Sequence, residues 1–325
     1  MLMQITQELI FNVGLLFIMM LPGVVMKKCG LCSADFGKGL SNLVLYIAQP
    51  ALIVFAYLDF EGEGIWLNSL IVFLLSVIAH VIFAVCALLL FRGAPEARQK
   101  MLRFATIFSN AAFMGIPLIS AILGDEATIY ASIYNVTFNI FLWTLGVYLC
   151  AQKEKEDGTK RSLSEIIPLK KLIFHPVMIA SFLGIAFLAI GINSYVPDIV
   201  MSSFSMLKGL VAPLSMVVLG LRISDIHARE HIKDKNMYIF LALRHFLLPA
   251  LVIFSIWGLK AIGLPISEIA EIVVVILAAT PAATSSTMFA EKFDCDAAYV
   301  SALVTVSTLL SVVSMPLMVY MLSLV

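Results

Sequence analysis

The chain has 325 residues, of which 61% are hydrophobic and 13% are charged, and its mean hydropathy is +1.02. A soluble domain carries about 25% charged residues, so this composition excludes a water-soluble protein built around one core and predicts an all-α membrane protein with the lipid bilayer as its main partner. The 21 Lys and Arg residues balance the 21 Asp and Glu residues, and we therefore expect no nucleic-acid partner.

The N-terminal region lacks the basic start of a signal peptide, because Met1–Glu8 contains no Lys or Arg. We interpret the apolar stretch that follows as the first membrane-spanning helix. The five cysteines are scattered along the chain, so they form no disulfide framework of the secreted kind. Cys29-Gly-Leu-Cys32 has a C-x-x-C spacing without a second pair, and we interpret it as an ordinary loop rather than a metal or redox site.

A membrane-spanning helix needs about 20 mostly apolar residues. Ten segments meet the requirement approximately, and in chain order they are 7–26, 40–58, 65–91, 101–122, 127–150, 173–192, 200–221, 237–258, 268–290 and 297–323. Polar residues and prolines interrupt the fourth and the ninth of these segments. The sequence therefore predicts ten transmembrane helices.

Lysine and arginine mark one side of the membrane. They gather after the odd-numbered segments, for example at Lys27–Lys28 and between Lys153 and Lys171, whereas acidic residues follow the even-numbered segments with Lys260 as the exception. Cytoplasmic loops are enriched in Lys and Arg. We therefore expect a multi-pass protein of the cell membrane (inner or plasma membrane) with both termini outside the cytoplasm.

The chain divides into two halves at the hydrophilic stretch Gln152–Lys171, which separates five predicted helices from five. Pro50 and Pro213 lie at matching depth in the second and seventh helices, and the interrupted fourth and ninth helices also correspond. An odd number of helices in each half gives the halves opposite topologies, which is the inverted repeat of many secondary transporters. The expected units are a first repeat at 1–150, a cytoplasmic linker at 151–172 and an inverted second repeat at 173–325.

The interrupted fourth and ninth helices are the main candidates for a binding site. Proline removes a backbone donor, and backbone groups that are freed inside hydrocarbon are costly unless protein or water satisfies them. We interpret the two segments as discontinuous helices that cross near the middle of the membrane, with two simply kinked helices as the alternative. The amides that begin each second half would then attract an anion such as a carboxylate.

The predicted substrate-binding residues lie in these two breaks and on one face of the fifth helix. They are Asn110, Gly115, Ile116, Pro117, Thr280, Pro281, Thr284, Ser285, Ser286, Asn135 and Asn139. For Asn135 and Asn139 the alternative is a hydrogen bond to a neighbouring helix, which is common for polar residues in membranes. We expect no catalytic residue, metal site or cofactor, and coupling to Na⁺ or H⁺ is compatible with the sequence.

Several charged or titratable positions allow two interpretations. Lys208 lies within the seventh predicted helix, where a lysine is either functional or reaches to the membrane surface. We interpret His80 as a packing residue, with proton relay as the alternative, and Arg244 and His245 as anchors at the membrane interface. The stretch 227–231 fits the H-x-x-E-H zinc peptidase pattern, but it is a short basic loop with no third ligand, so we expect no enzyme activity.

The motif Asn110-x-x-Phe113-Met114-Gly115-Ile116-Pro117-Leu118 resembles the signature of the auxin efflux carrier family. This family includes the plant PIN-type carriers and bacterial malate or malonate permeases. Pro281 with Phe289-Ala290-Glu291-Lys292 resembles the ninth helix of the family, and Pro50 and Pro213 also fit. The resemblance covers essentially the whole chain.

The resemblance implies a bile-acid-symporter-like fold. Predicted helices 1, 2, 6 and 7 would form a scaffold that is often dimeric, and helices 3–5 and 8–10 would form a transport domain that moves past it in an elevator motion. Asn110 matches the family's substrate-binding asparagine in the fourth helix. The late asparagine of the plant carriers has no counterpart in the ninth-helix break, where Thr284–Ser286 stand instead, so a bacterial-type permease fits better than an auxin carrier.

We therefore expect a secondary active transporter, a permease or efflux carrier, for a small organic anion such as a carboxylate. The absence of a Gly-rich phosphate loop in the sequence argues against ATP hydrolysis within this chain, and an interior-negative membrane potential favours anion exit. The alternatives are a sodium-coupled importer of an organic anion and an anion channel that uses the same crossover site. A homodimer through the scaffold helices is also expected from the resemblance.

Overall fold

The computed structural model describes residues 2–324 with the exception of 34, 63, 152–161, 163–165, 224–230 and 232. Most of the predicted linker and most of the H-x-x-E-H stretch therefore lie outside the described residues. Among the residues that are described, every regular element is a helix, and the only strand-like pairing is one isolated bridge. This result agrees with the predicted all-α class.

The first part of the chain, up to residue 150, forms seven α-helices and three π-helical segments. They are α1 (Leu2–Lys28), α2 (Phe36–Leu43), η1 (Val44–Ala48), α3 (Gln49–Leu58), α4 (Ile65–Leu89), α5 (Glu96–Ile107), η2 (Ala111–Gly115), α6 (Ile116–Phe141), η3 (Leu142–Gly146) and α7 (Val147–Cys150).

The described residues of the second part continue in the same way. They form α9 (Leu169–Ile173), α10 (Pro176–Ile190), the 3₁₀ turn η4 (Ile192–Tyr195), α11 (Asp198–Lys208), α12 (Val211–Ile223), α14 (Lys235–Ala242), the π-helical η5 (Leu243–Leu247), α15 (Leu248–Ala261), α16 (Glu268–Ala279), α17 (Ser285–Lys292) and α18 (Ala297–Leu322).

Seven stretches of continuous helix are long and apolar enough to cross a membrane by length and composition. They are 7–28, 36–58, 65–89, 111–150, 198–223, 235–261 and 297–322. This count differs from the ten predicted helices for three reasons. The ninth predicted segment is divided into α16 and α17, the second half of the fourth is continuous with the fifth in the helical stretch 111–150, and the sixth contains the 15-residue α10.

The 40-residue stretch 111–150 is interrupted at Gly124, which lies between the fourth and fifth predicted segments. Gly124 has φ 76° and ψ −159°, which is non-helical backbone inside α6. A positive φ of this kind favours glycine, because a Cβ atom would clash with the backbone. The residues on either side of Gly124 therefore belong to two helical segments that meet at a glycine turn.

Three of the π-helical segments end two residues before a proline. Pro50, Pro117 and Pro249 each occupy the first turn of the α-helix that follows η1, η2 and η5, respectively. Proline has no N–H group and its ring crowds the carbonyl four residues earlier. The preceding turn widens to relieve this conflict, and such widened turns are frequent at functional sites.

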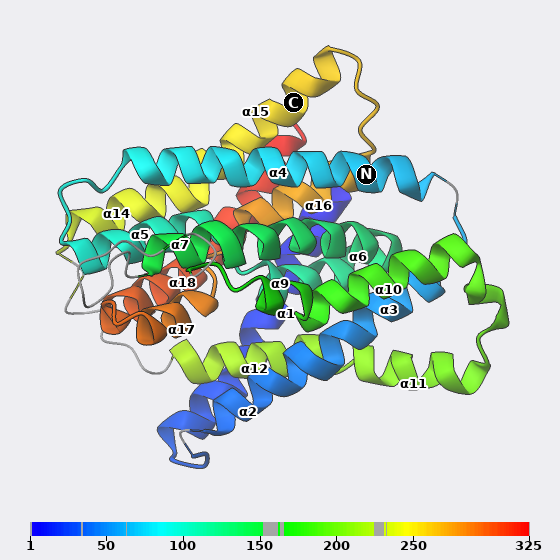
Figure 1. Cartoon of the computed structure of the whole chain (residues 1–325), viewed down its shortest axis with the longest axis horizontal. Coiled ribbons are helices and arrows are strands. Elements are labelled where there is room, and N and C mark those ends of the chain that lie inside the picture. Colours follow the sequence, from blue (N-terminus) through cyan, green and yellow to red (C-terminus); the bar gives the residue numbers. More distant parts are fainter. Residues whose placement is uncertain are drawn as a thin grey trace.

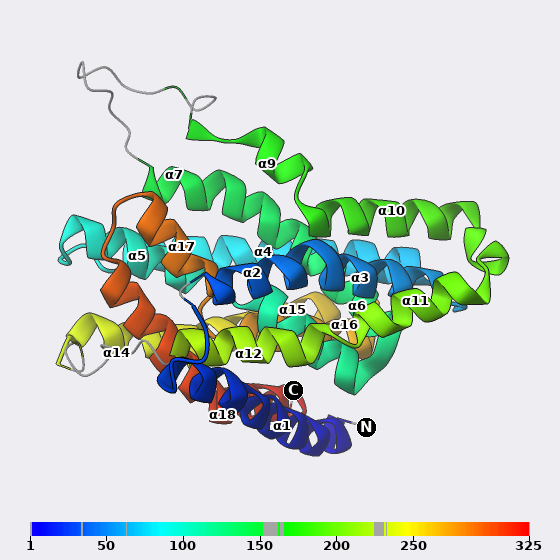
Figure 2. The ribbon, with the colours of Figure 1, turned by 90° about the horizontal axis from the view of Figure 1, so that it is seen from below.

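The helices pack into two groups that contact one another (Figure 1, Figure 2). α1 packs along α12, and α3 packs against α10 and α11. In the other group α4, α6, α16 and α18 pack together, with α5, α15 and α17 around them. Figure 1 shows α4 crossing the upper part of the molecule, while α2, α11 and α12 form its lower edge. α1 lies beside α18 and joins the two groups.

Two glycines allow α1 and α12 to approach closely. A Cβ atom on Gly23 would lie 2.2 Å from the carbonyl oxygen of Val217, and one on Gly220 would lie 2.0 Å from that of Met20. Helices in membranes associate largely through such small residues, because lipid supplies no hydrophobic drive between them. The α1–α12 contact therefore depends on glycine at both positions.

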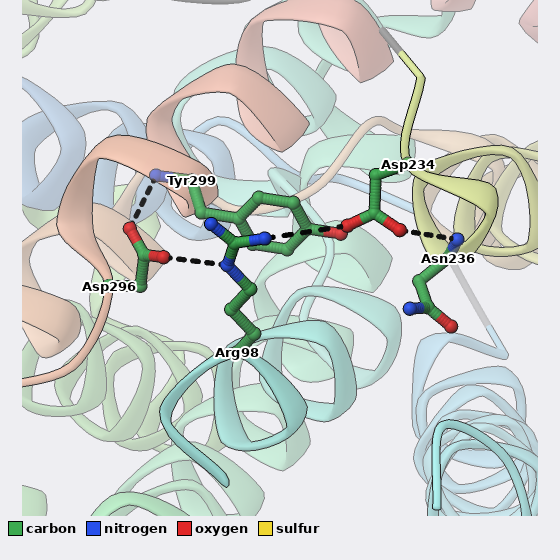
Figure 3. A network of polar contacts seen from close by, with 5 residues as sticks. All are labelled: Arg98, Asp234, Asn236, Asp296 and Tyr299. Atoms are coloured by element: carbon green, nitrogen blue, oxygen red, sulfur yellow. Dashed lines mark hydrogen bonds and ion pairs between the residues drawn. The ribbon is translucent and has the colours of Figure 1, made fainter. Parts of the chain in front are cut away.

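An arginine-centred network ties together three helix ends (Figure 3). Arg98 in α5 donates through Nε to Asp296 at 2.8 Å, and its Nη1 lies 3.9 Å from a carboxylate oxygen of Asp234. Asp234 and Asp296 are the N-caps of α14 and α18 and accept from the amides of Asn236 and Tyr299. Burial alone would raise the pKa of Asp296, but the hydrogen bonds from Arg98 and from the Tyr299 amide lower it on balance. The network fixes the start of α5 relative to α14 and α18.

The close approach of α1 and α12 gives a test of the packing. Gly23→Ala places a methyl group against the α12 backbone, which must shift at a cost of about 1–3 kcal/mol, so we expect a lower unfolding temperature of the detergent-solubilised protein. The matched control is Gly14→Ala in the same helix, where a Cβ atom has nothing within 4 Å. Equal unfolding temperatures for the two variants would contradict the helix contact.

Candidate functional site

Two helices of the structure stop inside the protein, and their breaks lie side by side. α5 ends at Ile107 and helix resumes at Ala111, while α16 ends at Ala279 and helix resumes at Ser285. We call residues 108–110 the first break and residues 280–284 the second break. The expected interruptions are thus present as non-helical backbone, not as two kinked helices.

The two breaks are joined by main-chain hydrogen bonds. Ser109 and Ala282 form an isolated antiparallel bridge. The amide of Asn110 donates to the carbonyl of Pro281 at 2.8 Å, and the amide of Ala283 donates to the carbonyl of Phe108 at 2.9 Å. Each break therefore satisfies backbone groups of the other, which is required where no water is available.

Arg244, in the π-helical segment η5, binds the second break and the last turns of α5 and α16. Its side chain is fully buried and donates to the carbonyls of Thr280 at 2.8 and 3.1 Å, of Ala278 at 3.0 Å and of Thr106 at 3.2 Å. The interpretation of Arg244 as an interfacial anchor is therefore wrong. Hydropathy assigns an arginine near a helix end to the interface, but the carbonyls that the breaks release offer it partners in the interior.

His245, next to Arg244, is also fully buried, so its interpretation as an interfacial anchor is wrong as well. Its Nδ1 lies 2.7 Å from the Ser314 hydroxyl and its Nε2 lies 2.9 Å from the Ser307 hydroxyl. The Ser307 oxygen also accepts a hydrogen bond of 3.0 Å from the amide of Ala282 in the second break. His245 and Ser307 thus hold this break from the side of α18.

A cavity of about 140 Å³ opens beside the two breaks, and we call it the break cavity. It is bounded by the first turns of the second half-helices, by one face of α6 and η3, and by residues that neighbour them. The lining residues are Leu45, Ser109, Asn110, Ala112, Phe113, Asn135, Phe138, Asn139, Leu142, Trp143, His175, Ala283, Thr284, Ser285, Met288 and Phe289.

Five of the eleven residues that the sequence analysis selected line this cavity: Asn110, Asn135, Asn139, Thr284 and Ser285. They come from the first break, from α6, from the second break and from α17. The structure therefore brings together residues that are up to 175 positions apart in the chain, between Asn110 and Ser285. Their role in binding a substrate stays a prediction.

The other six selected residues do not line the cavity, although all are buried. The carbonyls of Thr280 and Pro281 accept from Arg244 and from the amide of Asn110, respectively. A Cβ atom on Gly115 would lie 2.4 Å from Leu277 Cδ2, so this glycine packs on α16. The remaining three are Ile116, Pro117 and Ser286. These six residues build the breaks without facing the cavity.

The break cavity contains polar hydrogens without a partner. Among the described residues, Asn110 Nδ2, Asn135 Nδ2 and Trp143 Nε1 are buried and form no hydrogen bond. The orientation of the Asn135 amide is set by Asn139, whose Nδ2 donates to Asn135 Oδ1 at 3.2 Å and to the Asn135 carbonyl at 2.8 Å. Buried polar groups are nearly always paired in folded proteins, so three unpaired donors on residues that line one cavity are an exception, which a bound acceptor would remove.

Sequence analysis assigned no binding role to the aromatic residues that line the cavity or to two lysines near Trp143. Phe138, Trp143 and Phe289 line it, and the ammonium nitrogens of Lys171 and Lys292 lie 5.9 and 6.0 Å from the centre of the Trp143 ring. Partial burial, together with the nearby charge of Lys171, lowers the pKa of Lys292. In the sequence Lys171 marks membrane orientation and Lys292 belongs to the motif that resembles the ninth helix of the family, and no spacing rule connects either lysine to Trp143.

Two polar side chains reach the breaks from the group of helices around α3 and α12. Gln49, at the start of α3, donates through Nε2 to the carbonyl of Ala112. Arg222, near the end of α12, donates through Nη1 to the carbonyl of Thr284 and to the hydroxyl of Thr287, both at 3.1 Å. These contacts join the two helix groups next to the cavity.

The structure also places the two residues that were open to functional interpretations. Lys208 forms an ion pair with Asp125, with its nitrogen 2.9 and 3.0 Å from the carboxylate oxygens, and lies 3.8 Å from the centre of the Phe55 ring. His80 is fully buried, its Nδ1 lies 2.7 Å from the Ser76 carbonyl, and its ring stacks on Phe141. Neither residue lines the break cavity.

The contact of Ser307 with the second break can be tested by mutation. Ser307→Ala removes the acceptor for the Ala282 amide and a partner of His245, and leaving such buried groups unpaired costs about 1–3 kcal/mol. We expect a lower unfolding temperature than for Ser311→Ala in the same helix, because the Ser311 hydroxyl donates within its own helix to the Thr308 carbonyl. An equal effect of both substitutions would contradict the role of Ser307.

Comparisons with known proteins identify the family of the chain. The "Membrane transport protein" family matches residues 9–319. An uncharacterized transporter of Methanothermobacter thermautotrophicus is 25% identical over 305 residues, which cover 92% of this chain and 94% of the relative. A second uncharacterized transporter, from Methanocaldococcus jannaschii, is 24% identical over 215 residues, or 65% of this chain and 67% of that protein.

A mouse protein named lysosomal cholesterol signaling protein is 27% identical over 186 residues, which are 53% of this chain and 21% of the mouse protein. The family match extends over nearly the whole chain and agrees with the resemblance of the Asn110–Leu118 motif. The chain therefore belongs to the membrane transport protein family, that of the auxin efflux carriers, which is a family of membrane transporters and not of enzymes.

Proposed function

We propose that the protein is a secondary carrier of a small organic anion and that the carboxylate of this anion binds in the break cavity. The observation that carries the proposal is the set of buried donors without partners, Asn110 Nδ2, Asn135 Nδ2 and Trp143 Nε1, in a cavity beside two helix breaks. An ionised carboxylate acts only as a hydrogen-bond acceptor and donates none. It is therefore the simplest ligand that would satisfy all three groups.

The electrostatics of the half-helices favour an anion at this place. The first amides of a helix have no acceptor within the helix, and the helix dipole places about half a positive charge at this end. The segment η2–α6 begins at Ala111 and α17 begins at Ser285, and residues next to both starts line the cavity. Lys171 and Lys292 beside Trp143 add positive charge at its rim.

The walls of the cavity restrict the size and the character of the substrate. Phe113, Phe138 and Phe289 surround the polar groups with apolar surface. Pockets for small molecules combine such walls with a few well-placed polar groups, which orient the ligand. A compact anion with an apolar portion beside its carboxylate fits a cavity of about 140 Å³.

We further propose that the chain has ten transmembrane helices in two inverted repeats, 1–150 and 173–325, joined by the linker 151–172. The pairing of α5–η2 in the first part with α16–α17 in the second supports this repeat, because each is a half-helix, a break and a second half-helix. The scaffold would consist of α1, α2–α3, α10 and α11–α12, which contact one another. The remaining helices would form the moving domain of an elevator.

Localisation and assembly follow from the same proposal. We propose that the protein lies in the cell membrane with both termini outside the cytoplasm, because Lys and Arg gather in the loops that would then be cytoplasmic. The apolar outer faces of the scaffold helices would form a homodimer. The membrane potential is worth about 2.3 kcal/mol per charge for each 100 mV. It drives export of an anion without a coupled ion.

The binding site is tested by the affinity of the purified protein for carboxylates, measured by calorimetry after a thermal-shift screen has identified a ligand. Asn110→Ala and Asn135→Ala each remove a donor to a charged ligand, a loss of about 1.5–3 kcal/mol or roughly 10- to 100-fold in affinity. Ser285→Ala should also weaken binding, because this residue lines the cavity.

Ser286→Ala is the matched control, since Ser286 is adjacent in sequence, buried and not part of the cavity lining. It should bind the ligand like the wild type. Wild-type affinity of the Asn110→Ala variant, or an equal loss in both serine variants, would refute the site.

The elevator motion is tested at the ion pair between Lys208 in α11 and Asp125 in α6, which links the proposed scaffold to the moving domain. The pair Lys208→Cys and Asp125→Cys is placed in a background in which the five native cysteines are replaced. Joining the pair with a short bis-methanethiosulfonate reagent, which forms a disulfide with each cysteine and releases methanesulfinate, should stop carboxylate counterflow in proteoliposomes, because the two domains can no longer slide. Reduction of the link should restore the counterflow.

Each single-cysteine variant treated with the same reagent is the control and should transport at its untreated rate. A joined protein that still transports at the rate of the unlinked protein would argue against sliding domains. It would favour a static pathway through the breaks, as in a channel.

A further inference from the structure

Arg244 is the most unusual charge in the described part of the protein. Its side chain is fully buried, and an arginine stays protonated under all ordinary conditions. Among the described residues no carboxylate forms an ion pair with it. A buried charge without a counter-ion is costly and is retained only where other groups compensate it.

The compensation comes from the main chain of the two broken helices. All of the hydrogen bonds of the guanidinium group go to carbonyl oxygens, and these belong to Thr106, Ala278 and Thr280. Thr106 lies in the last turn of α5 and Ala278 in the last turn of α16. The last carbonyls of a helix lack partners and carry the negative end of its dipole, so Arg244 neutralises both negative ends at once.

Oxygen atoms that converge from broken helices are also what a coupled cation requires. In transporters with discontinuous helices, unwound carbonyls and the C-terminal ends of half-helices coordinate Na⁺ or H⁺. Here the guanidinium group of Arg244 already occupies the space between the carbonyl ends of α5 and α16. A sodium ion at this place would compete with a tethered cation for the same oxygens.

We propose that Arg244 is a built-in cation of the two breaks, which takes the place of a coupled sodium ion and makes binding of the anion independent of Na⁺. The inference rests on the proposed anion site. Arg244 does not line the cavity, so it is a positioning residue. It holds Thr280, whose neighbour Pro281 accepts from the amide of Asn110.

The charge of Arg244 also acts on the anion directly through the protein interior. The interior has a low effective dielectric constant, and a charge is felt there over longer distances than in water. Thr280 and Pro281 separate Arg244 from Asn110, which lines the cavity. Removal of the charge therefore changes the affinity for the anion, whereas a role in packing alone would change only stability.

The test is the dissociation constant of the tightest-binding carboxylate, measured by calorimetry on the full-length protein in NaCl and in choline chloride at equal ionic strength. The wild type should bind equally in both salts. Arg244→Gln, which keeps polar contacts without the charge, should bind at least about tenfold more weakly in both. Arg244→Lys, which keeps the charge, should recover most of the affinity. Arg103→Gln, which removes a charge in α5 away from the cavity, should bind like the wild type.

Wild-type binding that appears or strengthens tenfold only in Na⁺ would overturn the role of Arg244 and leave the anion site intact. Wild-type affinity of folded Arg244→Gln would overturn it as well. If Arg244→Gln does not fold, the comparison of the two salts in the wild type and in Arg244→Lys still decides the question. An absence of carboxylate binding in both salts would overturn the anion site itself and, with it, the role of Arg244.

Discussion

Two helices end inside the protein, and the backbone groups that each break releases must find partners where water is scarce. The structure solves this constraint by placing the breaks against each other, so that Asn110 pairs with Pro281 and Ala283 with Phe108. Arg244 donates hydrogen bonds to carbonyls at the C-terminal ends of α5 and α16. The donors without partners belong to Asn110, Asn135 and Trp143, which line a cavity beside the breaks. In the proposed function, this separation of donors from acceptors would favour an anion at the site.

The helical part of the fold is largely predictable, because about 20 apolar residues in a row have few stable alternatives to a membrane helix. Proline and glycine also locate the breaks, since Pro117 and Pro281 remove backbone donors inside apolar segments. The number of continuous helices is less predictable. The backbone turns at Gly124 without ending the helical stretch 111–150, and α10 has only 15 residues, so a length criterion applied to continuous helices finds fewer than ten.

The candidate site is only partly predictable from the sequence. The motif around Asn110 locates the first break, and the spacing of Asn135 and Asn139 places both on one face of α6. The sequence does not reveal which hydroxyl faces the cavity, because adjacent residues such as Ser285 and Ser286 differ only in direction. Burial of Arg244 is also hidden, since its partners are main-chain carbonyls that every sequence has and only a broken helix exposes.

The most direct measurement is a cryo-electron microscopy map of the protein with a brominated form of its tightest-binding carboxylate. The account predicts density for the carboxylate within hydrogen-bonding distance of Asn110 and Asn135, with the brominated portion against the aromatic wall at Phe138 and Phe289 and with the Arg244 guanidinium still on the carbonyls of both half-helices. A ligand bound elsewhere, with the break cavity filled by side chains, would contradict it. Continuous helices through residues 105–120 and 275–290 would do the same.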